Sequence, residues 1–173
     1  YNDRISSHSG GMSIIDRPSY NIPIEIETGN GGTCFITSND VNYCQGTGSN
    51  GQLGYGSTGS PTSPTKIKYF DEPLKSLSMK NQHSCGIDYE NTLWCWGYNN
   101  YGQLGIGNVN QYSQRQEVTQ DITGKELGIV QQVEVGFYYH SCAIIDFSAY
   151  CWGHNNYGQL GDSTTSNRNR PTK

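Results

Sequence analysis

The protein has 173 residues, of which 15% are charged and 12% are aromatic, a composition that suits one domain of ordinary size with a packed core. Its net charge of −4 argues against nucleic-acid binding, which needs a basic surface. No run of 18 apolar residues occurs, so no membrane span is predicted. The sequence begins at Tyr1 rather than at Met, and we expect it to be an excerpt of a longer chain.

Short β-strands are the elements predicted along the chain. The first is marked by Ile22, Ile24 and Ile26, which alternate with other residues and predict a strand with one buried face. Glu25 and Glu27 lie between the isoleucines, so we expect them in a solvent-facing row rather than as an acid/base pair. The first strand should therefore bury its isoleucines.

Three hairpins are predicted further along. The segments 35–43, 86–94 and 143–150 each have apolar or aromatic ends, and turn residues between such ends favour a hairpin. Val133 and Val135 flank a polar residue and predict another strand before the third hairpin. Helical periodicity is weak throughout, so we expect an all-β fold.

An internal repeat organises these elements. Gly-Gln-Leu-Gly occurs at residues 51–54, 102–105 and 158–161, about fifty residues apart, as in repeats built from several short strands. The glycine-rich stretches are expected to be turns between strands. The predicted segments are an N-terminal extension or the end of a preceding repeat (1–19), repeat 1 (20–69), repeat 2 (70–125) and a truncated repeat 3 (126–173).

The six cysteines repeat in step with these segments. They form three local pairs: Cys34 with Cys44, Cys85 with Cys95, and Cys142 with Cys151. Cysteines opposite each other across an antiparallel hairpin lie within disulfide range, so we expect three disulfides. Buried free thiols are the alternative, and a zinc site lacks the usual close Cys-x-x-Cys grouping. Disulfides would place the protein outside the reducing cell interior, extracellularly or at a cell surface.

Two longer stretches carry a family resemblance. His83–Asp88 and Leu93–Gly105, which includes Trp-Gly-x-Asn-x-x-Gly-Gln-Leu-Gly, resemble the regulator-of-chromosome-condensation repeat, and the third copy repeats both. The first copy departs, because Gly32 replaces the histidine and Gln45 replaces the tryptophan of Cys-Trp-Gly. The resemblance implies a β-propeller of four-stranded blades, usually seven in a ring. About three copies are present, so the ring is not closed within this chain. The cysteine pairs look like those of extracellular members.

No catalytic or cofactor site is predicted. Two Gly-x-Gly-x-x-Gly stretches begin at Gly46 and Gly54, but both lie in a turn between strands and lack the helix that a dinucleotide needs. His83 and His140 occupy equivalent places in two copies, which favours a repeated structural histidine over a metal or proton-transfer pair. We therefore predict no enzyme activity, no catalytic residues, no cofactor and no metal ligands.

Aromatic residues give the candidate site. Trp96 and Trp152 are expected to fill the space between blades. Tyrosines recur in the turns before Gly-Gln-Leu-Gly and in an aromatic loop before His140, and such side chains suit interfaces. For two of them, Tyr101 and Tyr157, a purely structural role in the turn is the competing interpretation. The candidate interface residues are Tyr98, Tyr101, Phe137, Tyr138, Tyr139 and Tyr157.

These features predict a non-enzymatic, secreted or surface-displayed module for protein–protein interaction or extracellular assembly, with a protein partner or self-association. A filament subunit is one form of such an assembly, because head-to-tail contacts that do not close generate fibres. One alternative is a glycan-binding propeller. The other is a nucleotide-exchange or chromatin-associated regulator, as the family's name suggests, which would require reduced thiols and usually a basic tail.

Overall fold

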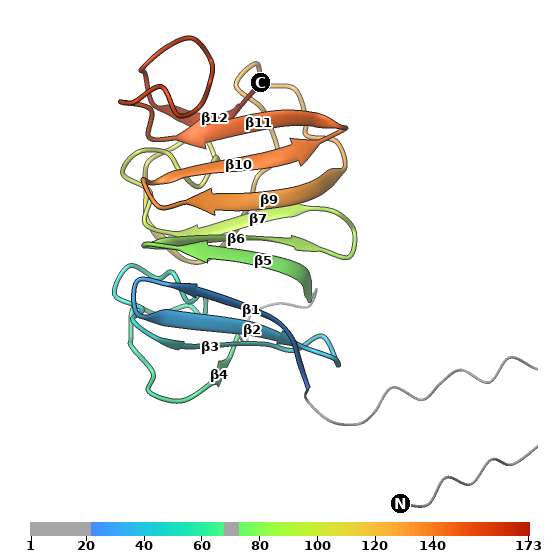
Figure 1. The fold of residues 1–173 in the computed structure, drawn as a ribbon, viewed down its shortest axis with the longest axis vertical. Helices are drawn as coiled ribbons and strands as arrows, with labels where there is room; N and C mark the ends of the chain where they lie inside the picture. The colour runs from blue at the N-terminus through green and yellow to red at the C-terminus, as the bar shows by residue number, and fades with distance from the viewer. Residues whose placement is uncertain (1–21, 68–72) are drawn as a thin grey trace, which may run out of the picture.

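The computed structural model describes residues 22–67 and 73–173. In these ranges the chain forms three four-stranded antiparallel sheets and contains no helix long and apolar enough to cross a membrane. We call the sheets blades 1, 2 and 3 (Figure 1). Blade 1 comprises β1 (Pro23–Gly29), β2 (Gly32–Thr37), β3 (Asn42–Gly46) and β4 (Thr65–Lys66). Blade 2 comprises β5 (Leu74–Lys80), β6 (His83–Asp88), β7 (Leu93–Gly97) and β8 (Tyr112–Glu117). Blade 3 comprises β9 (Val130–Gly136), β10 (His140–Ile145), β11 (Ser148–Gly153) and β12 (Arg168–Thr172).

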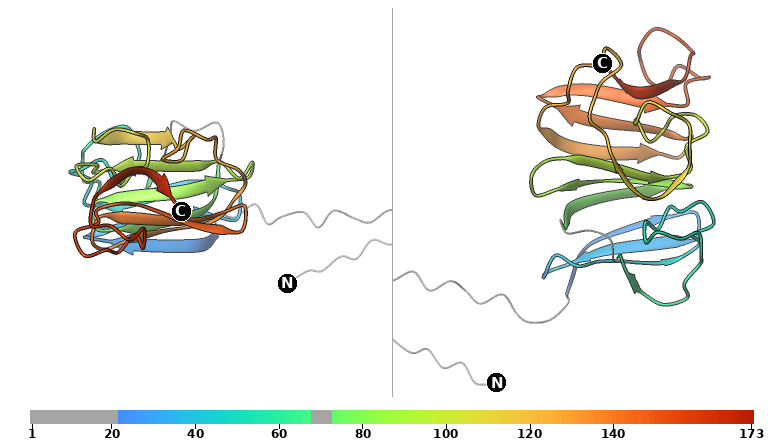
Figure 2. Two further views of the ribbon diagram at one scale, coloured as in Figure 1. Left: turned by 90° about the horizontal axis from the view of Figure 1, so that it is seen from above. Right: turned by 180° about the vertical axis from the view of Figure 1, so that it is seen from behind.

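The blades are stacked in chain order. In each blade the strands follow one another as a meander. The first strand of each blade contacts the first strand of the next, β1 with β5 and β5 with β9 (Figure 1). The same order is visible from behind in Figure 2, where blade 2 lies between blades 1 and 3. The predicted all-β blade architecture is therefore confirmed, and the three described blades do not close a ring.

The same contact joins both pairs of neighbouring blades. Trp96 Nε1 and Ser84 Oγ of blade 2 each donate a hydrogen bond of 2.8 Å to Gln52 O of blade 1. Trp96 is fully buried against the preceding blade, as expected. The contact between blades 2 and 3 repeats this arrangement with the equivalent residues: Trp152, Ser141 and Gln103.

The structure forms all three predicted disulfides. In each hairpin the two cysteines lie directly opposite each other, and their Cα atoms are 4.1 Å apart. The third pair is one residue closer in sequence. Its hairpin turns through only Asp146 and Phe147, which both have positive φ. The shorter turn thus absorbs the one-residue difference.

The first strand forms, but the prediction of its buried face was wrong. Ile24 and Ile26 are 61% and 64% exposed, whereas the glutamates between them point toward blade 2. Glu25 accepts a hydrogen bond from Leu77 N at 2.8 Å, and Glu27 accepts one from Met79 N at 3.4 Å. The physical reason is that β5 is the edge strand of its sheet, and its backbone N–H groups need acceptors from the neighbouring blade.

Blade 3 has a fourth strand, which differs from the truncated repeat expected there. β12 pairs with β11, with Cys151 opposite Thr172 and Gly153 opposite Arg168. The strand has the sequence Arg-Asn-Arg-Pro-Thr, which lacks the alternation of apolar and polar residues that marks a strand. The sequence pattern therefore carried no signal for it.

Candidate interaction surface

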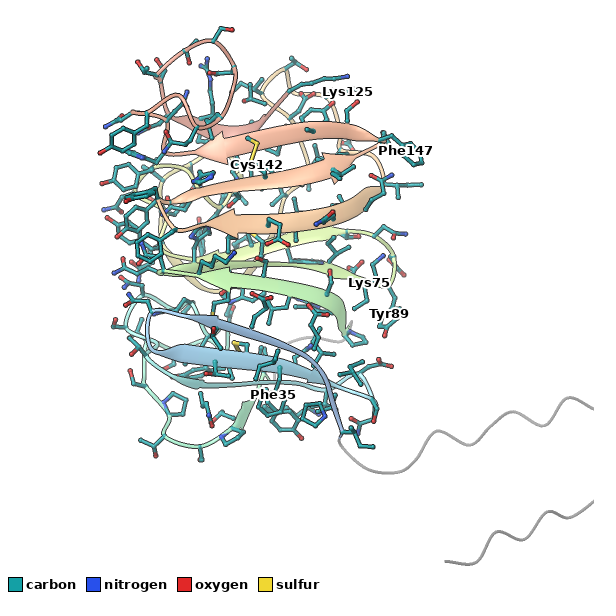
Figure 3. The ribbon with its side chains drawn as sticks, in the orientation of Figure 1. Phe35, Lys75, Tyr89, Lys125, Cys142 and Phe147 are labelled. Atoms are coloured by element: carbon teal, nitrogen blue, oxygen red, sulfur yellow. A yellow bond between two sulfur atoms is a disulfide. The ribbon has the colours of Figure 1, made fainter. Side chains whose placement is uncertain are left out.

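The six candidate interface residues lie together at one end of blades 2 and 3. They come from the turn between β9 and β10 and from the loops that follow β7 and β11. Figure 3 shows a group of ring-bearing side chains at this end, on the left of the picture. With one histidine they form a continuous set, which we call the aromatic surface: Tyr98, Tyr101, Phe137, Tyr138, Tyr139, His154 and Tyr157.

The inner part of the aromatic surface is a group of three tyrosines from two blades. The ring centroid of Tyr139 lies 5.4 Å from that of Tyr98 and 5.3 Å from that of Tyr101. Tyr98 and Tyr101 approach each other edge to face at 6.3 Å. These separations are typical of favourable aromatic pairs. All three side chains are half-buried, so their mutual contacts hold the rings in place.

The outer part is more exposed. Phe137, Tyr138 and Tyr157 have 65%, 60% and 79% of their surface accessible. Tyr138 contacts Phe137 edge to face, with centroids 5.6 Å apart, and Tyr157 at 6.1 Å. Asn81 donates a hydrogen bond of 2.9 Å to the backbone oxygen of Phe137. This bond ties the β9–β10 turn to blade 2.

His154 joins the inner and outer parts, although no partner for it is apparent in the sequence. Its ring lies 4.7 Å from that of Tyr101 and 6.0 Å from that of Tyr157. Its Nδ1 is 3.0 Å from Gln159 Nε2. The signal that could have found it is its position, because His154 follows Cys-Trp-Gly as Tyr98 does in the preceding repeat.

The aromatic surface is poor in charge. None of its seven residues is Asp, Glu, Lys or Arg. Burial raises the pKa of the Tyr98 hydroxyl, and the neighbouring hydroxyls of Tyr101 and Tyr139 raise it further, so Tyr98 is neutral at physiological pH. A pocket of 250 Å³ lies beside Tyr101 and is lined mostly by polar side chains: Asn100, Tyr101, Val109, Ile122, Asn167, Arg168 and Asn169.

The two repeated histidines lie behind this surface, at the contact between blades 2 and 3. His83 is fully buried, and its Nε2 is 2.9 Å from Ser141 Oγ. Burial lowers the pKa of His83 to about 3, and the nearby His140 also lowers it. Burial likewise lowers the pKa of His140. Among residues 22–67 and 73–173, no three His, Cys, Asp or Glu side chains are grouped as a metal site would require. A packing role fits both histidines.

Two buried asparagines stabilise the loops that carry the aromatic surface, and the sequence analysis had overlooked them. Asn99 Oδ1 accepts a hydrogen bond from Leu104 N at 2.9 Å, and its Nδ2 donates to the backbone oxygens of Asn108 and Asn110. Asn155 makes the equivalent bonds in blade 3. The signal was present in the repeated Trp-Gly-x-Asn string, which places an asparagine at the same point of both loops.

The stacked four-stranded meanders and the repeated contact between them define a β-propeller repeat protein. Comparison with family models gives two matches, both described as the regulator of chromosome condensation (RCC1) repeat: one to residues 74–103, the other to residues 90–144 and 148–173. Together they span more than half of the sequence. The chain belongs to the RCC1 repeat family.

Similar proteins are much longer than this chain. The mouse E3 ubiquitin-protein ligase HERC2 is 29% identical over 151 residues, covering 87% of this chain but 3% of HERC2. The mouse X-linked retinitis pigmentosa GTPase regulator is 29% identical over 147 residues, covering 84% and 14%. The Arabidopsis thaliana ultraviolet-B receptor UVR8 is 31% identical over 117 residues, covering 67% and 26%. The chain thus spans about a quarter or less of each of these relatives.

Solved structures share the fold. Prp20p from Saccharomyces cerevisiae superimposes with a TM-score of 0.71 at 21% identity, over 87% of this chain and 38% of Prp20p. Human WBSCR16 gives a TM-score of 0.60 at 16% identity, over 87% and 52%. At these identities the likeness establishes the fold alone. The chain matches a little over a third of the Prp20p chain and about half of the WBSCR16 chain.

Proposed function

We propose that this chain is a non-catalytic binding module that recognises a protein partner through the aromatic surface, outside the reducing cell interior. The observation that carries the proposal is the convergence of seven ring side chains from two blades on one end of the stack. Three of them are more than half exposed. Exposed clusters of tyrosine and phenylalanine are enriched at protein interfaces.

The arrangement of the rings favours tight binding. Tyrosine presents a large apolar area and a hydroxyl while it loses little side-chain entropy on binding. Here Tyr101 and Tyr139 are already in contact, and the β9–β10 turn is tied to Asn81. Because the surface is ordered before a partner arrives, binding costs less conformational entropy. Since none of its seven residues is Asp, Glu, Lys or Arg, we expect a partner with a weakly charged, partly apolar surface.

The proposed location depends on the three disulfides. Disulfides persist in secreted and surface-exposed proteins and are rare where glutathione keeps thiols reduced. All six cysteines are paired in the structure. We therefore favour an extracellular or surface-displayed module over the nucleotide-exchange or chromatin-associated alternative, which works in a reducing compartment.

A glycan ligand is the second candidate. The pocket beside Tyr101 is lined by three asparagines, and amide groups can both donate to and accept from sugar hydroxyls. Tyr101 is a half-buried ring at the edge of this pocket, where a sugar could stack. This observation favours a neutral oligosaccharide as the alternative ligand for the same end of the molecule.

The experiment is a binding screen of the full chain against a panel of purified ectodomain and secreted proteins, with a glycan array in parallel. The double variant Phe137→Ser/Tyr157→Ser removes the two most exposed rings of the aromatic surface. We expect it to weaken binding of any partner by about 30-fold or more, since the loss of even one interface anchor typically costs about 2 kcal/mol.

Phe147→Ser is the matched control. Phe147 is 93% exposed and lies in the β10–β11 turn, at the opposite end of β10 from the aromatic surface (Figure 3). The control variant should bind as the unmodified chain does. A protein partner whose affinity survives the Phe137→Ser/Tyr157→Ser change, or a ligand found only on the glycan array, would contradict the proposal.

A further inference from the structure

Blade 1 carries a segment rich in hydroxyl groups between its Gly-Gln-Leu-Gly turn and β4. Residues 56–66 contain six serines and threonines and two prolines, in the order Gly-Ser-Thr-Gly-Ser-Pro-Thr-Ser-Pro-Thr-Lys. The segment leads to β4, an edge strand of its sheet (Figure 1). Segments that combine Ser, Thr and Pro in this way are typical carriers of O-linked sugars.

The hydroxyl groups of this segment differ in what they contact. Ser57 Oγ and Ser60 Oγ each accept a hydrogen bond from a backbone N–H, at 3.0 and 3.1 Å, and so help to hold the loop in place. The side chains of Thr58, Thr62 and Ser63 are exposed, and their hydroxyls make no hydrogen bond within residues 22–67 and 73–173. These three hydroxyls are therefore free to react.

The prolines give the segment an extended backbone. Pro64 follows Ser63 directly, and a residue before proline is restricted to extended conformations. Pro61 fixes its own φ, and its carbonyl accepts a hydrogen bond of 2.7 Å from Gly46 N at the end of β3. An enzyme that modifies a hydroxyl must bind the surrounding chain, and a segment that is already extended loses less conformational entropy on binding.

The accessibility of the segment does not depend on what packs against blade 1. Blade 2 has an equivalent segment of the same length, which likewise runs from Gly-Gln-Leu-Gly to the partner of the second cysteine, and blade 1 packs against blade 2. Gln114, the equivalent of Ser63, is nevertheless exposed, and Val109, the equivalent of Thr58, is 53% exposed. Both positions thus stay accessible in a blade that has a neighbour on this side.

Thr62 occupies a different kind of position. Its equivalent in blade 2 is Ser113, which is half-buried. A Cβ added to Gly51 of blade 1 would lie 2.5 Å from Ser113 Cα, so this position belongs to the contact between blades. Thr58 and Ser63 remain as the two hydroxyls that are exposed, without hydrogen bonds and outside a blade contact.

We propose that Thr58 and Ser63 are acceptor sites for O-linked sugars, and this proposal rests on the extracellular location proposed above. A glycosyltransferase would supply the sugar from a nucleoside diphosphate sugar. The hydroxyl oxygen forms a bond to the anomeric carbon, and the bond between that carbon and the phosphate oxygen breaks. The nucleoside diphosphate leaves, and the hydroxyl proton passes to a base of the transferase.

A neutral sugar fits the segment better than a phosphate group. Lys66 is the one charged side chain in residues 54–67, whereas a phosphate that orders a loop pairs with clustered Arg or Lys. The three disulfides point to the same compartments in which secreted proteins receive their sugars. A sugar would also shield an exposed loop, the kind of segment that proteases cut first.

Glycopeptide mapping of the protein from its natural source tests the proposal. Free thiols are alkylated at extraction, and the digest is analysed by a fragmentation method that leaves sugars on their residues. We expect peptides that contain residues 56–66 to be heavier by whole sugar residues, with the sugars on Thr58 and Ser63. The loop 161–167 of blade 3 is an internal control, because it contains serines and threonines but no proline, and it should carry no sugar.

Two variants produced in the same source complete the test. Thr58→Ala/Ser63→Ala should lose every sugar-bearing form of the segment. Thr165→Ala/Ser166→Ala, which removes two exposed hydroxyls from blade 3, is the matched control and should keep them.

The map separates a failure of this proposal from a failure of the proposed location. An unmodified segment in a chain with three intact disulfides would overturn the sugar sites and leave the location standing. Alkylated cysteines would contradict the location itself. Phosphate on Ser63, or sugar that persists in the Thr58→Ala/Ser63→Ala variant, would also overturn the proposal.

Discussion

The shared carbonyl of Gln52 predicts a non-additive loss of stability. Ser84 Oγ and Trp96 Nε1 both donate to this oxygen, each at 2.8 Å, and both side chains are fully buried. Removing one donor leaves the oxygen paired with the other. Removing both leaves a carbonyl without these partners inside the contact between blades 1 and 2. The double variant Ser84→Ala/Trp96→Phe should therefore lose more stability than the two single variants together.

The magnitudes follow from these contacts. Ser84→Ala removes one hydrogen bond and should cost about 1 kcal/mol. Trp96→Phe removes a hydrogen bond and part of a fully buried ring, and should cost about 2–3 kcal/mol with the resulting cavity. In the double variant the unpaired carbonyl adds about 1–2 kcal/mol, a coupling that a double-mutant cycle measures directly.

The assay is urea unfolding of the unmodified chain, the two single variants and the double variant, all with their disulfides intact. Unfolding is monitored by far-ultraviolet circular dichroism, so the signal does not depend on tryptophan fluorescence. The equivalent pair in the other contact, Ser141 and Trp152, is an internal replicate and should show a coupling of the same sign. A strictly additive double variant at both contacts would refute the idea that one carbonyl is the common acceptor that joins the blades.

Three further effects are expected. Asn155→Ala should destabilise the chain by about 2–3 kcal/mol in urea unfolding, because a buried side chain that satisfies several backbone groups is lost. A value near zero would contradict its role. The low pKa of His83, about 3 in the folded chain, means that the unfolded chain binds more protons below pH 6.5. Stability should thus fall as the pH drops from 6.5 toward 3, and His83→Gln should flatten that slope in thermal melts. An unchanged slope would exclude His83 as the cause. Reduction should lower the unfolding free energy by about 2.7 kcal/mol for each disulfide loop opened, and an unchanged urea midpoint would contradict this.

The repeated residues made most of the fold predictable from the sequence. Cys85 and Cys95 recur in step with the turn motif, so the hairpin and its disulfide followed from spacing alone. Trp96 neighbours a paired cysteine, and the alternation of a strand placed it on the opposite face of the sheet. Local periodicity identifies the strands and the cysteine pairs of the hairpins, because both depend on residues that are close together in the sequence.

Features that depend on neighbouring blades were not predictable in this way. The alternation around Ile24 identified a strand, but the choice of buried face depended on the edge amides of β5, which lie fifty residues away. His154 has one aromatic neighbour, Tyr101, in the preceding blade and another, Tyr157, in its own loop. The first repeat has Gln45 at the position of Trp96 and Trp152, and only the packing of the blades shows that the two tryptophans serve the same contact.

The candidate interface was predicted residue by residue from turn tyrosines and one aromatic loop. The structure brings those residues into one surface, because the loops after β7 and β11 occupy equivalent places in adjacent stacked blades. Sequence spacing could not place the β9–β10 turn against the loop of blade 2. That contact arises from the packing of one sheet on the next.

We propose a stack of blades, each with its own disulfide, that acts outside the reducing cell interior. Peptide mapping of the protein from its natural source tests this proposal most directly. Free thiols would be alkylated at the moment of extraction, and the digest analysed by mass spectrometry without reduction. We expect three cross-linked peptide pairs that join Cys34 to Cys44, Cys85 to Cys95 and Cys142 to Cys151. Alkylated cysteines in most molecules would contradict the claim.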